Sequence, residues 1–402
     1  MIKILTIAGL LFATGSTTVA EPLSWPQWRG PDRNGLGPKN PPLSNSLTGL
    51  APLWLAERIP SGDQGGRGGL IVHAGNVYGL ACASSKSTGT DDVFCLDAAT
   101  GKSIWNARYP ETCGAGAGSS TPCIANGKLY VVGSGSKVYC LNADNGSPIW
   151  EATLSRSGKE PIASSIAVLG KTAVLLADVL TGLDAETGKV VWKQNKITGF
   201  ESSPAQWSSK GRDYVICSND RETYCVDPVD GKILWSVPGG GKSTPVVAQE
   251  YGGDFLLTMS ENRKNGLTAY RLSDKAPQKL WTLPVCDRGS SPVVYDGHVY
   301  ALAGGNNGHS AHLLCVHLDS GKVAWDEVVG FAEVSSPVVV DRKVFAVCGT
   351  FLLLLQATPE KYSVLSQADY RITLCTSPTI VEGRLYVRQA NAVACYDLRS
   401  AP

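Results

Sequence analysis

Long apolar runs are absent from this sequence. Beyond the first 20 residues none approaches the roughly 18 residues that a membrane-spanning helix needs, and Phe351–Leu355 is only strand-sized. An excess of charge is also missing, because 36 Lys and Arg stand against 35 Asp and Glu and the formal net charge is +1. This balance excludes a polybasic nucleic-acid binder and an acidic solvating tail. We therefore expect no membrane insertion and no nucleic-acid partner.

Motifs for metal binding and for nucleophilic catalysis are also scarce. The 12 cysteines include no Cys-x-x-Cys pair, so a tetrahedral zinc site is unsupported. Three of the five histidines lie close together, at His309, His312 and His317, but strand alternation puts His312 and His317 on opposite faces. Residues 114–118 lack the glycine spacing and the following helix of a dinucleotide-binding loop. We predict no metal site and name no catalytic residue.

The first 20 residues have the pattern of a secretory signal peptide. Lys3 supplies the positive charge, an apolar run extends to Phe12, and Thr18-Val19-Ala20 is a small-residue cleavage site. We expect residues 1–20 to be removed and the mature chain to be soluble and exported, either to the periplasm or out of the cell.

A repeated unit dominates the rest of the chain. It opens with Ser-Ser or a similar pair, continues through apolar runs separated by Gly-containing turns, and closes with a tryptophan. The closing residues are Trp54, Trp105, Trp150, Trp192, Trp235, Trp281 and Trp325. Four short antiparallel strands in a period of about 40–50 residues are typical of a β-propeller blade. An irregular β-sandwich array is the alternative fold.

Counting these units predicts eight blades, with seven as the alternative count. The last unit, from Thr376 onward, has three strands and no closing Trp, whereas Pro52–Leu55 has that Trp and no preceding strands. We expect this N-terminal strand to complete the last blade, which removes two unpaired sheet edges. The predicted domains are the signal peptide, a Trp-rich leader over 21–49 and one propeller over 50–402.

The cysteines follow the repeat. Five of them occupy one position on the third strand of a blade, where the third blade has Leu183: Cys95, Cys140, Cys225, Cys315 and Cys395. We expect these five to be small buried apolar residues. A Cys217–Cys225 hairpin disulfide is the alternative.

The turn and closing strand of each unit resemble the tryptophan-docking repeat of the pyrroloquinoline quinone (PQQ) propellers. The segment Leu96-Asp97-Ala98-Ala99-Thr100-Gly101-Lys102-Ser103-Ile104-Trp105 shows the pattern, and residues 183–192 and 226–235 repeat it. The resemblance covers about residues 50–400 and implies that each Trp packs between neighbouring blades. Residues Trp25–Gly35 also look like a leader found on exported PQQ-like repeat proteins of planctomycetes and their relatives.

The resemblance implies two classes of function, and the fold alone does not choose between them. One class is the PQQ-dependent alcohol and sugar dehydrogenases. The other is a set of cofactor-free exported scaffolds, such as the propeller subunit of the outer-membrane β-barrel assembly machinery. The alcohol dehydrogenases have a disulfide of adjacent cysteines over the cofactor, oxygen ligands for Ca²⁺, an Asp as base and long insertions. Here no two cysteines are adjacent and the loops are short.

We therefore favour a non-catalytic binding or scaffold module without a cofactor. Its partner is expected to be an envelope or extracellular protein or a small ligand, and the oligomeric state stays open. The alternative is a PQQ- and calcium-dependent alcohol or sugar dehydrogenase. Carbohydrate binding at the channel mouth, which Trp207 and the polar loops would permit, is a third hypothesis.

A binding site is expected at the mouth of the central channel, among charged residues just before each inner strand. These residues either form a polar ligand pocket or pair with one another in solvent. They are Arg67, Glu201, Lys242, Asp287, Arg288, Glu333 and Arg371. The leader is expected to pack over one face or side of the ring through Trp25 and Trp28, with partner docking as the alternative.

Overall fold

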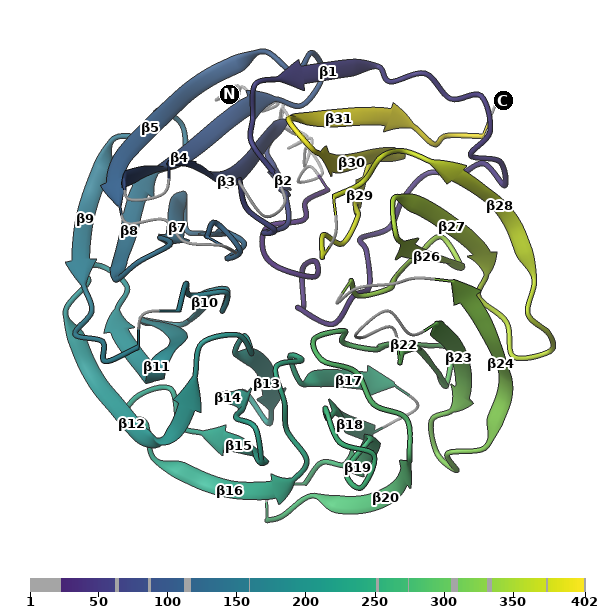
Figure 1. The fold of residues 1–402 in the computed structure, drawn as a ribbon. Helices are drawn as coiled ribbons and strands as arrows, with labels where there is room; N and C mark the ends of the chain where they lie inside the picture. The colour runs from purple at the N-terminus through teal and green to yellow at the C-terminus, as the bar shows by residue number, and fades with distance from the viewer. Residues whose placement is uncertain are drawn as a thin grey trace, which may run out of the picture.

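The computed structural model describes residues 23–61, 65–85, 88–111, 117–158, 160–250, 253–273, 275–304, 310–330, 335–373 and 375–400. These residues form 31 strands in eight antiparallel sheets and no helix. The sheets surround a central axis as blades (Figure 1), so the predicted eight-bladed β-propeller is confirmed. In the described part of the chain no helix is long and apolar enough to cross a membrane. The predicted signal peptide lies outside the described residues.

Strands within a blade follow the chain order from the axis outward. Blades one to four contain β2 (Ile71–His73), β3 (Asn76–Ser85), β4 (Thr88–Asp97), β5 (Ser103–Glu111); β6 (Cys123–Ala125), β7 (Lys128–Val132), β8 (Lys137–Asn142), β9 (Pro148–Thr153); β10 (Ala167–Leu169), β11 (Thr172–Asp184), β12 (Val190–Gly199); and β13 (Ala205–Ser209), β14 (Arg212–Ser218), β15 (Glu222–Val226), β16 (Ile233–Pro238). Blades five to seven contain β17 (Val246–Glu250), β18 (Gly253–Met259), β19 (Leu267–Arg271), β20 (Gln278–Leu283); β21 (Val293–Tyr295), β22 (His298–Ala303), β23 (Ala311–His317), β24 (Val323–Gly330); and β25 (Val338–Val340), β26 (Lys343–Cys348), β27 (Phe351–Gln356), β28 (Val364–Asp369).

The third blade differs from the others because one continuous strand takes two places. β11 pairs with β10 through Thr172–Val174 and with β12 through Asp178–Leu183. Asp178 lies between these two parts with a positive φ of 64°, which lets the chain change direction within a single residue. The third blade therefore has three strands, β10, β11 and β12, where the repeat predicts four.

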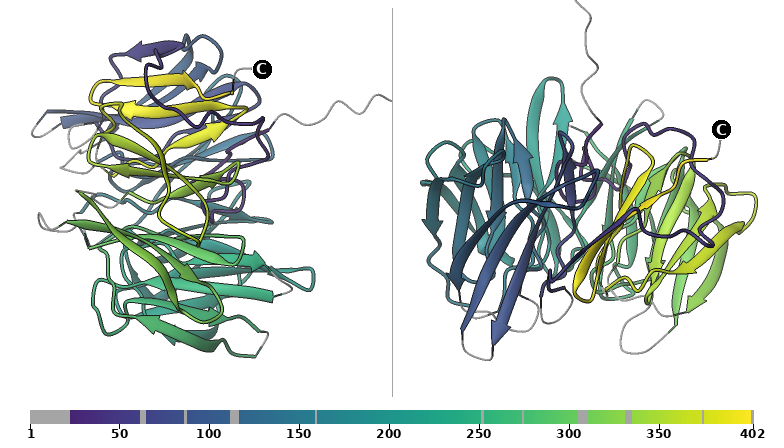
Figure 2. Two further views of the ribbon diagram at one scale, coloured as in Figure 1. Left: turned by 90° about the vertical axis from the view of Figure 1, so that its right-hand side faces the viewer. Right: turned by 90° about the horizontal axis from the view of Figure 1, so that it is seen from above.

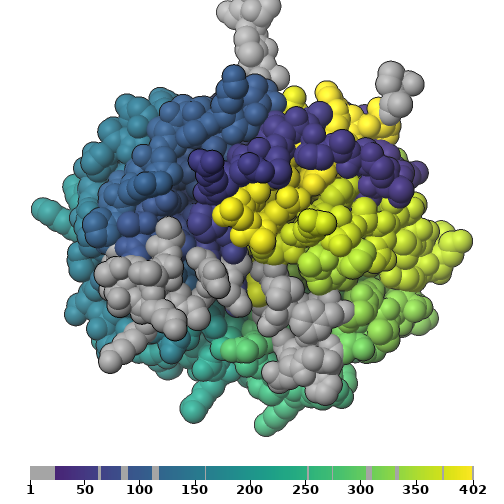
Figure 3. All heavy atoms as spheres, turned by 45° about the horizontal axis from the view of Figure 1, so that its top comes forward, coloured from purple at the N-terminus to yellow at the C-terminus, as the bar shows by residue number. Residues whose placement is uncertain are grey.

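The ring is closed by the N-terminal strand, as the sequence predicted. The eighth blade has the order β1 (Trp54–Glu57), β31 (Ala392–Asp397), β30 (Arg384–Gln389) and β29 (Thr379–Val381). Trp54 pairs with Cys395 and Leu55 with Ala394. Figure 3 shows the purple N-terminal segment against the yellow C-terminal strands at the surface. Closure leaves β31 paired on both sides, so its edge is not available to another chain.

The repeated tryptophans join each blade to the next. The indole N–H of six of them donates to a backbone carbonyl in a turn of the following blade, over 2.6–3.0 Å. Trp150, for example, donates to the carbonyl of Ala185. Its ring also covers Gly188, where a Cβ would lie 2.5 Å from a ring carbon. The glycine of the Thr-Gly pair therefore allows a positive φ, and its lack of a side chain lets the neighbouring indole ring pack against the backbone.

A belt of hydroxyl groups joins the blades close to the axis. The backbone N–H at the start of one inner strand donates to a Ser or Thr hydroxyl of the next blade over 2.7–3.1 Å, in the series Gly69, Thr121, Ser165, Ser203, Thr244, Ser291, Ser336, Ser377. At the last junction the hydroxyl of Thr379 donates instead to the carbonyl of Leu70, at 2.8 Å. The Ser-Ser element of the repeat thus satisfies buried backbone groups that no sheet hydrogen bond reaches.

The five cysteines of the third-strand position are buried free thiols. Cys217 and Cys225 are both free, so the alternative of a disulfide between them is wrong. Cys225 pairs in register with Ile216, the residue before Cys217. Because neighbouring residues of a strand point to opposite faces, the two thiols lie in different inter-blade cores. Cys82 is the disulfide-bonded cysteine of the described residues.

Candidate functional site

Part of the leader lies inside the ring, which has two faces. We call the face where the inner strands begin the rim face; it also carries the loops between the second and third strands. The opposite face carries the remaining hairpin turns. Residues 25–37 of the leader, purple in Figures 1 and 2, run at the centre of the ring between these faces. The leader then leaves the axis, and the backbone N–H groups of Leu43 and Leu47 donate to side chains of the seventh blade.

Hydrogen bonds fix the leader to inner strands on several sides of the channel. Trp25 forms a two-bond bridge with Val72 of the first blade, at 2.7 and 3.0 Å. Ile124 of the second blade donates to the carbonyl of Pro26 at 2.8 Å. Val339 of the seventh blade bonds to both Gly35 and Gly37 at 2.9 Å. The leader thus acts as a plug that the blades hold from within.

The side chains of two arginines anchor the leader to the sixth and third blades. Arg29 donates to the carbonyls of Ser291 and Pro292 in the sixth blade, the first at 2.6 Å. Arg33 donates to the carbonyls of Ser165 and Ile166 at the start of the third blade, both at 2.9 Å. Their side chains are 3 % and 1 % exposed. Burial lowers the pKa of Arg29 to about 9 and that of Arg33 to about 10, so both stay protonated at neutral pH.

Among the described residues neither arginine forms an ion pair with a carboxylate; backbone carbonyls take that place. Carbonyl dipoles aimed at a buried guanidinium offset part of its desolvation cost. The sequence analysis missed both residues, and the available signal was a pair of arginines within a short aromatic segment.

On the rim face, the predicted residues Glu201 and Lys242 do meet. They come from the loops before the fourth and fifth blades, and their charged groups lie 3.0 Å apart with about a quarter of each side chain exposed. Burial raises the pKa of Glu201, opposed by Lys242 and Arg288, while Glu261 adds to the rise. The pair is therefore partly desolvated, and Arg288 and Glu261 lie close enough to affect it.

Asp287 does not face the channel as a free ligand. It is 3 % exposed, and its carboxylate accepts the backbone N–H groups of Gly289 and Ser290 at 2.9 and 2.7 Å. Burial raises its pKa, and these hydrogen bonds oppose the rise. Asp287 holds its own loop in shape, which leads into the sixth blade.

The remaining predicted rim residues are scattered. Arg67 is half-buried and lines a small pocket of about 30 Å³ next to Trp28 and Arg29. Arg288 and Arg371 are exposed. Glu333 lies outside the described residues. The structure thus brings together Glu201 and Lys242 with their neighbours, and does not gather the whole predicted ring into one site.

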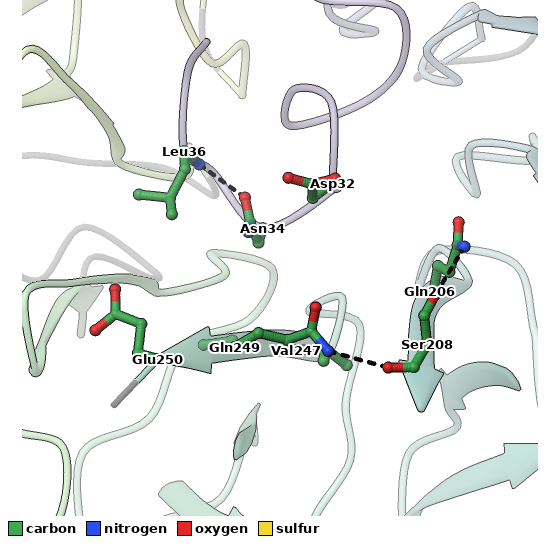
Figure 4. A pocket seen from close by; sticks show the side chains of 9 residues that line it. Asp32, Asn34, Leu36, Gln206, Ser208, Val247, Gln249 and Glu250 are labelled. Carbon is green, nitrogen blue, oxygen red and sulfur yellow. Dashed lines mark hydrogen bonds between the residues drawn. The ribbon is translucent and has the colours of Figure 1, made fainter. Parts of the chain in front are cut away.

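A larger pocket opens on the opposite face, between the leader and the inner strands of blades four and five (Figure 4). Its volume is about 290 Å³. The lining residues are Asp32, Asn34, Leu36, Gln206, Ser208, Val247, Ala248, Gln249 and Glu250. A pocket of this size is at the lower end of the range for small-molecule sites. The sequence analysis missed it, because half of its wall is the leader.

Polar atoms of this pocket that can accept hydrogen bonds outnumber those that can donate. The amide nitrogen of Gln206 donates to Asp213, and that of Gln249 donates to Asp254 and to the carbonyl of Ser208. The donors of both glutamines are therefore used within the protein. Their carbonyl oxygens and the carboxylate of Asp32 remain at the pocket wall, while one carboxylate oxygen of Glu250 accepts the N–H of Gly297 at 2.8 Å. The arrangement suits a small ligand that is rich in hydrogen-bond donors.

Trp207 is not available for the carbohydrate binding that the sequence permits at the channel mouth. Trp207 is 2 % exposed, packs on Tyr214 with ring centroids 4.8 Å apart and donates its N–H to Asp254 at 2.7 Å. A sugar-binding tryptophan needs an open ring face. Trp207 belongs to the core between blades four and five.

The sequence profile of a family described as "Outer membrane protein assembly factor BamB" matches residues 53–192, 89–327 and 176–401 in overlapping segments. The chain belongs to this family. No curated protein matches its sequence.

Solved propellers of both functional classes have the same fold. BamB from Moraxella catarrhalis is 14 % identical with a TM-score of 0.64, covering 87 % of this chain and 99 % of that one. The quinohemoprotein alcohol dehydrogenase ADHIIG from Pseudomonas putida HK5 is 13 % identical with a TM-score of 0.68, covering 95 % and 82 %. A europium-containing methanol dehydrogenase is 12 % identical with a TM-score of 0.69, covering 93 % and 91 %. At such identities the likeness establishes the fold of this family member and does not separate a scaffold from an enzyme.

A calcium ion and a quinone would need side chains of this family member as ligands. Within the described ranges, no group of three His, Cys, Asp or Glu residues is placed to hold a metal ion. Asp287 and Glu201 on the rim face are already engaged, the first by its own loop and the second by Lys242. Neither of these two carboxylates is therefore free to hold a calcium ion, and we derive no chemical step through a calcium–quinone site.

Proposed function

We propose that this protein is an exported, non-catalytic propeller that serves as a binding or scaffold module in the cell envelope. The leader in the channel is the observation that carries the proposal. Arg29 and Arg33 use the axis of the ring for internal hydrogen bonds, and both are buried. The surface left for a protein partner is the rim face with its loops, and the polar pocket on the opposite face is left for a small ligand.

Belonging to the BamB-described family supports a protein partner, because that printed name refers to assembly of outer membrane proteins. Loops between strands are also where recognition surfaces usually lie on rigid scaffolds. Among exposed apolar residues, Val328 on β24 is 60 % exposed close to the rim face, while Val229 in a turn of the opposite face is 77 % exposed. These two positions form a matched pair for locating a partner.

Cross-linking from these two positions tests the proposal. A photoreactive residue replaces Val328 in one variant and Val229 in the other, and the mature chain is cross-linked in isolated envelopes. We expect a discrete adduct from Val328 and none from Val229. Equal labelling from both positions, or no adduct from either, would contradict a partner on the rim face.

The alternative function, a PQQ- and calcium-dependent dehydrogenase, has a separate test. The melting temperature of the chain 21–402 is measured with PQQ in the presence and absence of Ca²⁺, and oxidation of alcohols and sugars is assayed. We expect no saturable rise in melting temperature. A rise that needs Ca²⁺ would establish a cofactor site, and the scaffold proposal would then fail.

A further inference from the structure

One cross-strand position of the propeller repeat has an unusual composition in the sixth blade. It joins the first residue of the second strand to the last residue of the third strand, on the face opposite to the rim face. The pairs in blades one, two, seven and eight are Asn76–Asp97, Lys128–Asn142, Lys343–Gln356 and Arg384–Asp397. In the sixth blade the same position pairs His298 with His317.

His317 replaces a residue that has a structural task in other blades. Asp97 accepts the backbone N–H groups of Ala99 and Thr100 at 3.1 and 2.7 Å and so caps the turn that follows. Asn142 caps the equivalent turn of the second blade at 2.9 and 3.2 Å. Within the described residues, the side chain of His317 accepts no hydrogen bond from the turn that follows it; this turn has two backbone hydrogen bonds at 2.9 Å and one from the N–H of Lys322 to the hydroxyl of Ser320 at 3.3 Å. The sixth blade thus gives up a stabilising cap.

The imidazole of His317 faces the imidazole of His298 instead. Nε2 of His298 and Nδ1 of His317 lie 3.2 Å apart, and the ring centroids are 4.7 Å apart. Two nitrogens bound to one tetrahedral ion at about 2.0–2.1 Å would be separated by roughly 3.3 Å. The observed distance is close to that spacing and is also that of an N–H···N hydrogen bond between the rings, so an ion would replace this bond after the rings turn to direct both nitrogens at it.

The other ring nitrogen of His298, Nδ1, makes a hydrogen bond to a backbone carbonyl, as the second nitrogen of many metal-binding histidines does. Nδ1 lies 2.6 Å from the carbonyl of Asp296 and must carry a proton to donate to it. Nε2 of the neutral ring is then left with a lone pair that points at His317. This hydrogen bond selects the tautomer that a metal ion requires.

Negative charge lies close by. The carboxylate of Glu250, from the neighbouring blade, accepts the N–H of Gly297 at 2.8 Å and interacts electrostatically with both Asp296 and His298. No third His, Cys, Asp or Glu of the described residues completes a cluster with the two rings. Water would fill the remaining coordination positions, as it does at open sites.

We propose that His298 and His317 together bind one divalent transition-metal ion of the class of Ni²⁺, Cu²⁺ and Zn²⁺. Imidazole nitrogen suits these ions, whereas Ca²⁺ and Mg²⁺ prefer oxygen ligands. The ion would tie β22 to β23 at the turn that lacks its cap. Neither histidine lines the polar pocket, although Glu250 lies between the pocket and the pair, and neither lies on the rim face, so metal binding and partner binding can be tested separately.

Titration calorimetry of the mature chain with NiCl₂ and ZnCl₂ tests the site, with MgCl₂ and CaCl₂ as negative controls. The informative variant is His317→Asp, which restores the residue that other blades use and should keep or raise the melting temperature in metal-free buffer. We expect one ion bound per chain, and an affinity at least about tenfold weaker in the variant, since one of two protein ligands is lost. Ni²⁺ or Zn²⁺ should raise the melting temperature of the unsubstituted chain only.

A second variant, His312→Ala, controls for metal binding elsewhere. His312 lies on the same strand, is exposed and bonds to Asp326 at 2.8 Å, away from the pair. Its loss should leave the affinity unchanged. Absence of binding to the unsubstituted chain, or equal affinity in His317→Asp, would overturn the proposal.

Discussion

The junction between a tryptophan and the glycine of the next blade can be tested by placing one methyl group at two different glycines. Gly188 and Gly127 both have a φ of +71°. A Cβ on Gly188 would lie 2.5 and 2.7 Å from carbons of the Trp150 ring, whereas a Cβ on Gly127 would have nothing within 4 Å. The pair Gly188→Ala and Gly127→Ala therefore separates backbone strain from displacement of the ring.

The expected costs follow from those contacts. An alanine at this φ costs about 1–2 kcal/mol in either place. At Gly188 the ring must also move, which adds about 1–3 kcal/mol of overpacking and endangers its 3.0 Å hydrogen bond to Ala185, worth about 1 kcal/mol. We expect Gly127→Ala to lose about 1–2 kcal/mol and Gly188→Ala about 3–6 kcal/mol of unfolding free energy.

Urea denaturation followed by tryptophan fluorescence and by circular dichroism measures both losses. Comparison of midpoints is valid if the two probes and the slopes agree among the three proteins. Equal losses in the two variants would refute the reasoning, because the tryptophan would then not depend on the glycine beneath it.

Three further predictions concern other parts of the ring. Ser203→Ala removes the hydroxyl that accepts the N–H of Ser165 at 2.9 Å; we expect a loss of about 1–3 kcal/mol in urea denaturation and recovery in Ser203→Thr, since threonine fills this place in two other blades. Deletion of residues 53–57 frees the edge of β31, and calorimetry should show one transition at a lower temperature for the whole ring; a separate early transition with the rest unchanged would count against closure by this strand. Asp287→Asn should stabilise the protein at pH 7, because burial raises the pKa of this carboxyl above its ordinary 3.8 and ionisation therefore opposes folding. That advantage should shrink as the pH falls through the raised pKa toward 3.8, and an advantage in urea midpoint that stays constant with pH would exclude the carboxyl as its cause.

Local patterns were enough to predict the architecture. The regular spacing of Trp, of Ser-Ser pairs and of Gly-containing turns defines each blade, because every strand pairs with one only a few residues away. Closure of the ring was also predictable, since the missing strand of the last unit and the extra strand near Trp54 complement each other. Repetition made these signals visible without any knowledge of long-range contacts.

The site was less predictable, because its residues meet only after the ring closes. Glu201 and Lys242 belong to loops of adjacent blades, and charge alone placed them near the same mouth. Asp287 was placed in the channel mouth by the same argument, yet its carboxylate bonds to its own loop. Charge identifies a residue as polar surface, but local hydrogen bonds decide whether it remains available.

The amino-acid sequence by itself determined the blade repeat, the number of blades and the strand that closes them. Only the tertiary structure decided that the leader fills the channel, since Arg29 bonds to carbonyls 262 and 263 positions further along the chain. The pairing of His298 with His317 was not predictable for a related reason: the two residues lie on adjacent strands, whereas alternation along the sequence relates only residues of one strand. Periodicity within a strand is readable in one dimension, whereas contacts across strands and across the axis exist only once the ring has formed.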